Sequence, residues 1–310
     1  MRSTFIRTLT QIASYDERVV LLTGDLGFSV IEPFADAFPD RFYNVGVAEQ
    51  NMIGLATGLA ESGFIPYTYS IATFATLRPF EFIRNGPVLQ HLPVRIVGVG
   101  GGFEYGHAGP THHAIEDIAV MRTQDGLAIA SPTDYEQAAS ALLALHDYDG
   151  PVYFRLGKDE RRVVPGLQGA FHIGKLEALQ SGGQIALVAT GSISPEVAVA
   201  TEQLAAEGLE VSFLVAGCLS PVPVDDLLQH LRGSRVAIVV ENHSRNGGLG
   251  SIVCEVVAEN SLPVRVVRCG IDGHQPSDSG GEEQYLNDWH HLSASKICET
   301  VRQQFALLER

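Results

Sequence analysis

Basic residues are scarce in this chain of 310 residues. Only 21 residues are Lys or Arg, against 36 Asp or Glu, and the formal net charge is -15 at pH 7. Binding to a nucleic-acid backbone needs clustered positive charge, so this balance argues against a DNA or RNA partner. Any anionic ligand must be bound by individual arginines placed in its site.

Cysteines are also few, and long apolar runs are missing. The four cysteines are Cys218, Cys254, Cys269 and Cys298. They show no CxxC spacing, so we predict neither a zinc site nor a disulfide framework but free thiols in a reducing cytoplasm. No apolar run approaches the roughly 20 residues of a membrane helix, so we expect a cytoplasmic protein that does not span a membrane.

Strand and helix patterns alternate along the first half of the chain. Strands are predicted at 19–24, 65–70, 94–100, 127–132 and 152–157, and helices at 49–61, 78–90, 115–122 and 134–146. The apolar positions of residues 1–17 fit one face of an ordinary first helix better than a transit peptide. The alternation predicts a mostly parallel, doubly wound sheet.

The alternation restarts after a charged and then glycine-rich stretch. Strands are predicted at 185–192, 209–217, 236–242 and 264–270. We therefore predict an α/β protein of two doubly wound domains, residues 1–160 and 176–310, joined by a linker at 161–175. Residues 273–291 are polar and are expected to form a surface loop before a final helix.

Two nucleotide-binding patterns fail in this sequence. In VGVGGGF at 97–103 the third glycine of a GxGxxG motif would fall on Phe103, whose side chain blocks close approach of a phosphate. The pairs Gly157-Lys158 and Gly174-Lys175 lack the upstream glycine and downstream hydroxyl of a P-loop. Nucleotide hydrolysis therefore has no support.

Three histidines lie close together in EYGHAGPTHHAIED, namely His107, His112 and His113. Such a group could ligate a metal. The intervening Gly-Pro breaks any helix, however, and no acid stands at a recognised metal spacing. We therefore favour a loop that offers one or two histidines to a substrate, with no metal held by this chain.

Glu49 stands directly before a run of small and apolar residues in FYNVGVAEQNMIGLATGLAESGF. An acid at a helix N-terminus is common because it complements the helix dipole. Here the helix is glycine-rich, and an aromatic cluster, TFATLRPFEF, and the histidine loop follow it. This neighbourhood favours a functional role for Glu49.

Together these segments resemble the C-terminal half of transketolases. The match is best over PDRFYNVGVAEQNMIGLATGLA, ATFATLRPFEFIRN, GPTHHAIEDIAVMR and ASPTD, and a weaker one continues through VENHSRNGGLG. The resemblance covers nearly the whole chain. It implies the pyrimidine-binding domain of a thiamine-diphosphate enzyme, followed by a transketolase C-terminal domain.

The resemblance implies a set of cofactor-binding residues. In this family the glutamate matching Glu49 hydrogen-bonds the aminopyrimidine ring of thiamine diphosphate and favours the imino tautomer, which removes the proton from thiazolium C2. Phe74 and Phe80 correspond to aromatic residues of the pyrimidine pocket, and stacking suits a flat heterocycle. Asp25, in LLTGDLG, matches an acid near the thiazolium.

The resemblance also implies substrate contacts. His112 matches the histidine of the GPTH loop that contacts donor oxygens and helps proton transfer. Arg2, Ser29 and Arg155 fall where transketolases hold the sugar phosphate, and guanidinium groups suit that anion. A structural salt bridge for Arg155 and simple exposure for Arg2 are the plain alternatives.

Two departures from the family pattern concern the substrate. Ala108 stands where the family has Asp before GPTH, and Gly100 or Gly101 stands where a further phosphate-contacting histidine or arginine is found. We therefore expect an atypical donor or acceptor among small sugar-like substrates.

The GDG motif and downstream asparagines of the family's diphosphate domain are missing from this sequence. The resemblance therefore implies a split transketolase that moves a two-carbon ketol unit from a ketose, expected to be a phosphate, to an aldehyde. An N-terminal partner subunit would supply the diphosphate site with Mg2+ or Ca2+, in an α2β2 heterotetramer. The chain alone is expected to be inactive.

Three alternatives remain open at this point. The beta subunit of a 2-oxo acid dehydrogenase first component shares the domain pair and the glutamate but usually lacks GPTH. A synthase similar to the deoxyxylulose phosphate enzyme shares GPTH but is normally a single chain. A non-catalytic partner subunit would have no physical need to keep Glu49, Phe74 and His112 together.

Overall fold

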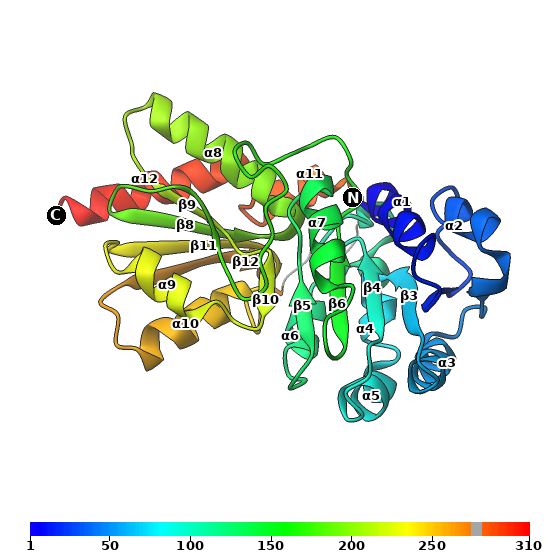
Figure 1. Ribbon diagram of the computed structural model, residues 1–310. Helices are drawn as coiled ribbons and strands as arrows, with labels where there is room; N and C mark the ends of the chain where they lie inside the picture. Colours follow the sequence, from blue (N-terminus) through cyan, green and yellow to red (C-terminus); the bar gives the residue numbers. More distant parts are fainter. Residues whose placement is uncertain (274–280) are drawn as a thin grey trace.

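The computed structural model describes residues 1–273 and 281–310 of the chain. They form two α/β lobes that lie side by side, as Figure 1 shows. Among these residues no helix is long and apolar enough to cross a membrane.

The first lobe is built on a seven-stranded sheet. Its order is β10-β5-β6-β4-β3-β1-β2. The strands are β1 (Val19–Thr23), β2 (Phe42–Asn44), β3 (Ile65–Ile71), β4 (Arg95–Val99), β5 (Ala128–Ala130), β6 (Val152–Leu156) and β10 (Cys218–Ser220). All neighbouring pairs are parallel except β10 with β5. The edge strand β10 comes from the second half of the chain, so the two halves are joined through one sheet.

Helices cover both faces of this sheet. They are α1 (Arg2–Ala13), α2 (Glu32–Ala37), α3 (Glu49–Glu61), α4 (Ala72–Thr76), α5 (Phe80–Ile83), α6 (Asp117–Met121) and α7 (Tyr135–Leu145). Helices α1 and α7 pack together over one face, and α3 and α5 lie on the other (Figure 1). Buried strands with apolar side chains on both faces need such cover on both sides.

The second lobe contains a five-stranded sheet of order β12-β11-β8-β9-β7. Its strands are β7 (Glu177–Gln180), β8 (Ile185–Thr190), β9 (Ser212–Val215), β11 (Val236–Ser244) and β12 (Arg265–Ile271). Its helices are α8 (Ser194–Ala206), α9 (Val224–Leu231), α10 (Leu249–Glu259), α11 (Glu283–Trp289) and α12 (Ala294–Leu308). In Figure 1, α8 and α12 lie on one face and α9 and α10 on the other.

The predicted pair of α/β domains with largely parallel sheets is confirmed. One correction concerns the loop expected at residues 273–291. Residues Glu283–Trp289 instead form α11, whereas 274–280 lie outside the described residues. A second concerns the helix predicted at 78–90, which is α5 followed by a π-helical turn at Arg84–Val88, where Pro87 cannot donate a backbone hydrogen bond.

A local sequence signal explains where α7 begins. The side chain of Asp134 caps α7 by accepting a hydrogen bond of 2.8 Å from the backbone N–H of Gln137. The Gln137 side-chain oxygen in turn accepts from the backbone N–H of Thr133 at 2.9 Å. The first bond satisfies a backbone donor that the first turn of a helix leaves free, and the second satisfies the donor of the residue before the cap.

Candidate active site

The candidate site lies where parallel strands of the first sheet end. Asp25 follows β1, Glu49 begins the helix after β2, Phe74 lies in the helix after β3, and His112 lies in the loop after β4. Open α/β sheets bind ligands at the carboxyl ends of their strands because neighbouring loops converge there. The fold therefore brings residues from four segments toward one edge.

Glu49 is the buried acid of this site, with 1% of its surface exposed. Its Oε1 accepts a hydrogen bond of 3.0 Å from Ser70 Oγ at the end of β3. Its Oε2 accepts one of 2.9 Å from an Arg78 guanidinium nitrogen. A carboxylate at this depth needs such donors, because burying an unpaired charge is costly. Two segments distant in sequence thus hold the carboxylate in place.

Arg78 links Glu49 to the aromatic part of the site. Its Cζ lies 3.8 Å from the centroid of the Phe74 ring, a distance at which a guanidinium is attracted to an aromatic face. The His112 ring meets the Phe74 ring at 5.0 Å between centroids in an edge-on arrangement. Glu49, Phe74 and His112 are therefore connected through consecutive contacts.

Asp25 lies on the surface with a left-handed backbone conformation, φ 59°. Its Oδ1 accepts from Asn44 Nδ2 at 2.9 Å, and its backbone N–H donates to Asn44 Oδ1 at 3.1 Å. Asn44 Oδ1 also accepts from the Gly46 N–H at 3.0 Å. Asn44 therefore connects the end of β1 to the turn that enters α3.

The three histidines of the glycine-proline loop diverge. His112 is half-buried, and its Nδ1 lies 3.0 Å from Thr111 Oγ1. His113 is buried and packs edge-on against Phe103 with 5.0 Å between ring centroids, whereas His107 is exposed. This placement offers His112 to the site and uses His113 in packing.

A single group with metal-ligand spacing is found within the described ranges, and it is remote in sequence from that loop. It consists of Asp16, His146 and Asp147. Both of its carboxylates already bind Arg18, at 2.6 Å for Asp16 and 2.8 Å for Asp147. The guanidinium takes the position of a cation, so this group supports no metal site.

Phe80 begins α5 and is half-buried. No ring contact connects it with Phe74 or His112 in the part of the chain that the structure describes. Its place in a pyrimidine pocket stays a prediction.

The residues predicted to bind phosphate each have their own surroundings within the chain. Ser29 is exposed, and its backbone N–H donates to Glu32 Oε1 at 2.7 Å, which places an anion beside it. Arg2 lines a cleft of about 480 Å3. The acidic side chains of that cleft are Glu104, Asp159, Glu160 and Glu283. The same cleft is also lined by Lys158 and Arg161, so its charge is mixed, and a phosphate contact of Ser29 and Arg2 stays a prediction.

Arg155 is held by several contacts within the chain. It is 2% exposed, and its Nε donates to Asp117 Oδ2 at 2.7 Å. Its terminal nitrogens donate to Asn242 Oδ1 at 2.9 Å, to the Asn242 carbonyl at 3.0 Å and to the Ala114 carbonyl at 3.1 Å. The guanidinium is used within the chain, where it joins β6 of the first lobe to β11 of the second. These contacts give Arg155 a structural role, and its predicted phosphate contact stays a prediction.

The same packing explains one departure from the family pattern. A Cβ atom on Gly101 would lie 2.4 Å from Arg155 Cζ. Cβ atoms in proteins do not approach other heavy atoms this closely. A histidine or arginine at position 101 would therefore displace the Arg155 guanidinium. The glycine is needed for the interdomain contact.

Replacing Arg155 by Met is expected to lower the free energy of unfolding by about 3–5 kcal/mol, because Asp117 would be left buried without its ion partner. Urea denaturation followed by circular dichroism measures this loss. Arg161→Met is the control, since Arg161 is 93% exposed. Equal stability of the two variants would contradict the structural role.

His243 lies in β11 beside this ion pair and is fully buried. Its Nε2 accepts from the Ala119 N–H at 3.3 Å, and its Nδ1 donates to the Ser244 carbonyl at 2.8 Å. These partners fix the neutral tautomer. Burial lowers the pKa of His243 to about 4, although the nearby Asp117 carboxylate opposes this shift.

The stability of the chain should therefore depend on pH through His243. The unfolded histidine binds its proton at a pKa near 6.5 but the folded one only near 4, so this contribution is present above pH 6.5 and is lost as the pH falls toward 4. The loss amounts to about 3 kcal/mol at most. Urea unfolding at several pH values should give a shallower decline for His243→Gln than for the wild type. Parallel pH profiles would contradict the assignment.

The sequence alone does not identify three residues of the site, namely Ser70, Arg78 and Asn44. Asn44 stands in the quoted segment FYNVG, and Arg78 follows the aromatic cluster. The position of Arg78 between Phe74 and Phe80 is a sequence feature that could have indicated its role. No local pattern singles out Ser70, because its role depends on β3 ending beside α3.

The sequence of the chain is similar to known proteins over nearly its whole length. Residues 1–163 match the family model for the transketolase pyrimidine binding domain, and residues 174–296 match the one for the transketolase C-terminal domain. The chain is 34% identical to one subunit of the apulose-4-phosphate transketolase of Phocaeicola vulgatus, over 97% of this chain and 96% of that protein. It is 33% identical to the 6-deoxy-6-sulfo-D-fructose transketolase subunit SqwH of Clostridium sp. (strain MSTE9), over 98% and 94%.

A solved structure described as a split gene transketolase, inactive beta4 tetramer, superposes with a TM-score of 0.86 at 32% identity. The superposition covers 97% of this chain and 96% of that one.

Proposed function

Because the chain belongs to the transketolase family, we propose that it is the second subunit of a split, thiamine-diphosphate-dependent transketolase. The observation that carries the proposal is the buried Glu49 carboxylate, joined through Arg78 to the face of Phe74. The relatives named as transketolase subunits support it, since each is matched over nearly its whole length.

The residues around Glu49 fit the aminopyrimidine ring of thiamine diphosphate. The Arg78 guanidinium is a flat group that donates an N–H to Glu49 and lies on the face of Phe74. A flat nitrogen heterocycle can make the same two contacts. Arg78, whose side chain is 39% exposed, has room to move toward solvent when the ring binds.

Each residue of the site then has a separate task. Glu49 would hold the proton shared with a pyrimidine nitrogen, and Phe74 would fix the plane of the ring. Asp25 would add negative charge near the thiazolium, and His112 would exchange a proton with a substrate oxygen. When bound, the cofactor supplies the carbanion chemistry, whereas the chain supplies position and electrostatics.

The partner would complete the site. In this proposal an N-terminal subunit binds the diphosphate with Mg2+ or Ca2+, and two copies of each chain form the cytoplasmic enzyme. The structure described as an inactive beta4 tetramer supports the need for a second subunit, because that split-gene relative is inactive as a tetramer of one chain type.

The outer face of α3 is the proposed partner surface. Leu55 is 45% exposed, and a Cβ added at Gly54 or Gly58 would meet nothing within 4 Å. Val47 just before the helix is 71% exposed, and Phe82 on the adjacent α5 is 44% exposed. This apolar surface belongs to the helix that begins with Glu49, so a partner covering it would lie beside the cofactor.

The proposed reaction transfers a two-carbon ketol unit from a ketose to an aldehyde. The apulose and sulfofructose names of the relatives support a specialised sugar substrate. The hydrogen bonds that hold Arg155 to Asp117 and Asn242 support a donor that differs from standard pentose phosphates.

The test is co-expression with a diphosphate-domain chain, followed by a ketol-transfer assay with thiamine diphosphate and Mg2+. Activity that needs both chains and the cofactor is the expected result, and comparing phosphorylated with unphosphorylated ketoses gives the donor class. Ketol transfer by the single chain would refute the split enzyme. Oxidation of pyruvate with an artificial electron acceptor would instead identify a 2-oxo acid dehydrogenase subunit.

A further inference from the structure

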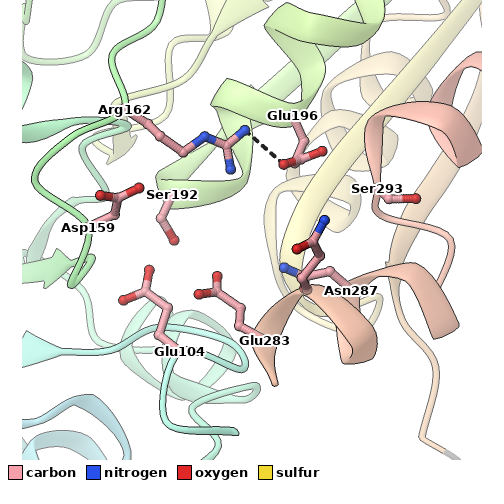
Figure 2. A pocket seen from close by; sticks show the side chains of 9 residues that line it. Glu104, Asp159, Arg162, Ser192, Glu196, Glu283, Asn287 and Ser293 are labelled. Atoms are coloured by element: carbon pink, nitrogen blue, oxygen red, sulfur yellow. Dashed lines mark ion pairs between the residues drawn. The ribbon is translucent and has the colours of Figure 1, made fainter. Parts of the chain in front are cut away.

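A cavity lies between the two lobes and shares Glu104, Asp159 and Glu283 with the cleft that Arg2 lines. It has a volume of about 310 Å3 and is lined by the loop after β4, the chain connecting the lobes, and helices α8 and α11. Figure 2 shows the side chains of Glu104, Asp159, Ser192 and Glu283 around one end of it, and Glu196, Asn287 and Ser293 toward the other.

Two buried oxygen atoms in the wall of this cavity have no hydrogen-bond partner within the described ranges. They are Glu104 Oε1 and Asn287 Oδ1, on side chains that are 8% and 7% exposed. Figure 2 shows the Glu104 carboxylate directed into the open space beside Glu283. Buried acceptors without donors cost free energy, so this wall is suited to a ligand that brings N–H groups.

The charged side chains of the cavity also favour a ligand that carries N–H groups. Its acidic side chains are Glu104, Asp159, Glu196 and Glu283. Arg162 is the one basic residue among the cavity's lining side chains, and it is ion-paired with Glu196 at 2.7 Å. The lining therefore has more acidic than basic side chains, although Lys158, whose Nζ donates to the Glu104 carbonyl at 2.9 Å, is a further cation nearby. In a partly enclosed space, the attraction of ionised carboxylates to a cation is stronger than in open water.

A single metal ion does not fit this arrangement. Within residues 1–273 and 281–310, the one group of three ligand atoms that all lie within 4.8 Å of one another is at Asp16, His146 and Asp147. The cavity's oxygens are spread more widely than one coordination sphere. A larger cation with separated nitrogen groups can reach both ends.

We propose that this interdomain cavity binds a small organic cation with two separated nitrogen donors, of the aliphatic diamine class. One ammonium group would lie between Glu104 and Glu283, and the other would approach Glu196 and Asn287. Because the ligand contacts both lobes, its binding stabilises their packing against each other.

Ligand binding at this site should depend on pH, because it is coupled to the protonation of Glu283 and Glu104. Burial, and then the neighbouring Glu104 charge, raise the pKa of Glu283 above its ordinary value, whereas Lys158 and Arg162 oppose the shift and Asp159 adds to it. Burial likewise raises the pKa of Glu104, although Ser192 opposes this. A bound ammonium favours the ionised carboxyls, so binding should release protons and tighten as the pH rises from about 6 to 8.

Isothermal titration of the full chain with 1,4-diaminobutane tests the proposal. Saturable binding of one molecule per chain is expected, and its heat should change between buffers of different ionisation enthalpy because protons are released. Glu104→Gln and Glu283→Gln should each weaken binding by about tenfold or more, since a charged hydrogen bond is lost. Glu259→Gln, at an exposed acid on α10, is the matched control and should bind like the wild type.

Three results would overturn the proposal. These are no saturable binding of the diamine, equal binding of uncharged 1,4-butanediol, and full affinity in Glu283→Gln. The last variant remains decisive if Glu104→Gln fails to fold, because Glu283 is partly exposed and its replacement leaves the buried wall intact. The titration needs no partner subunit or cofactor, so its result is independent of the proposed ketol transfer.

Discussion

Replacing Glu49 by Gln is expected to lower ketol transfer by the two-chain complex about 10²- to 10⁴-fold, the range in which proton transfer by a positioned side chain contributes. The amide has nearly the same shape and can keep the contact with Ser70. It cannot hold the shared proton as a carboxyl group does. The loss should therefore appear in kcat rather than in the assembly of the complex.

Glu202→Gln is the matched control for this experiment. Glu202 is exposed on α8 of the second lobe, away from α3, so its replacement should leave turnover unchanged. Size-exclusion chromatography and cofactor titration of both variants show whether assembly is intact. Full turnover by an assembled Glu49→Gln complex would refute the proposed role of Glu49. It would favour the alternative that this chain is a non-catalytic partner subunit.

A charge on the outer face of α3 is expected to prevent stable pairing with the second subunit. Leu55→Glu places a carboxylate in the middle of the apolar surface formed with Val47 and Phe82. A charge buried there without a partner should weaken binding about 10- to 100-fold, as does the loss of a central interface residue. Titration of the wild-type and variant chains against the diphosphate-domain chain measures the change in Kd.

Leu143→Glu is the control, because it makes the same change at an exposed leucine outside the proposed contact. Leu143 is 58% exposed on α7, a helix on the opposite face of the first sheet from α3. Its replacement should leave the Kd unchanged if α3 is the contact. Equal affinity of the Leu55→Glu and Leu143→Glu chains would place the partner on another face.

Features carried by a continuous segment could be predicted from the sequence. Helix α3 begins at Glu49 as its helical pattern indicates, and β1, β3 and β6 lie where short apolar runs predict them. Such patterns arise because side-chain periodicity reflects the local backbone. The position of Glu49 at the entry to the core followed from the same segment.

Contacts between distant segments could not be predicted in this way. The partners of Arg155, namely Asp117 and Asn242, are 38 and 87 residues away and lie in different lobes, so no local pattern reveals these contacts. Arg78 likewise gained its role only when the end of α4 came to lie beside Glu49. A side chain's charge indicates what it can bind, whereas the tertiary fold decides which partner reaches it first.

The edge strand β10 has a consequence for how the chain can be divided. It pairs antiparallel with β5, although it lies beyond the residues that match the pyrimidine-binding domain. A fragment ending at residue 163 would lose this strand and expose an unpaired β5 edge, which is a template for aggregation. Residues 1–163 are therefore a unit of sequence similarity whose sheet is completed by a strand from outside it, and a swap of this domain between relatives should carry β10 with it.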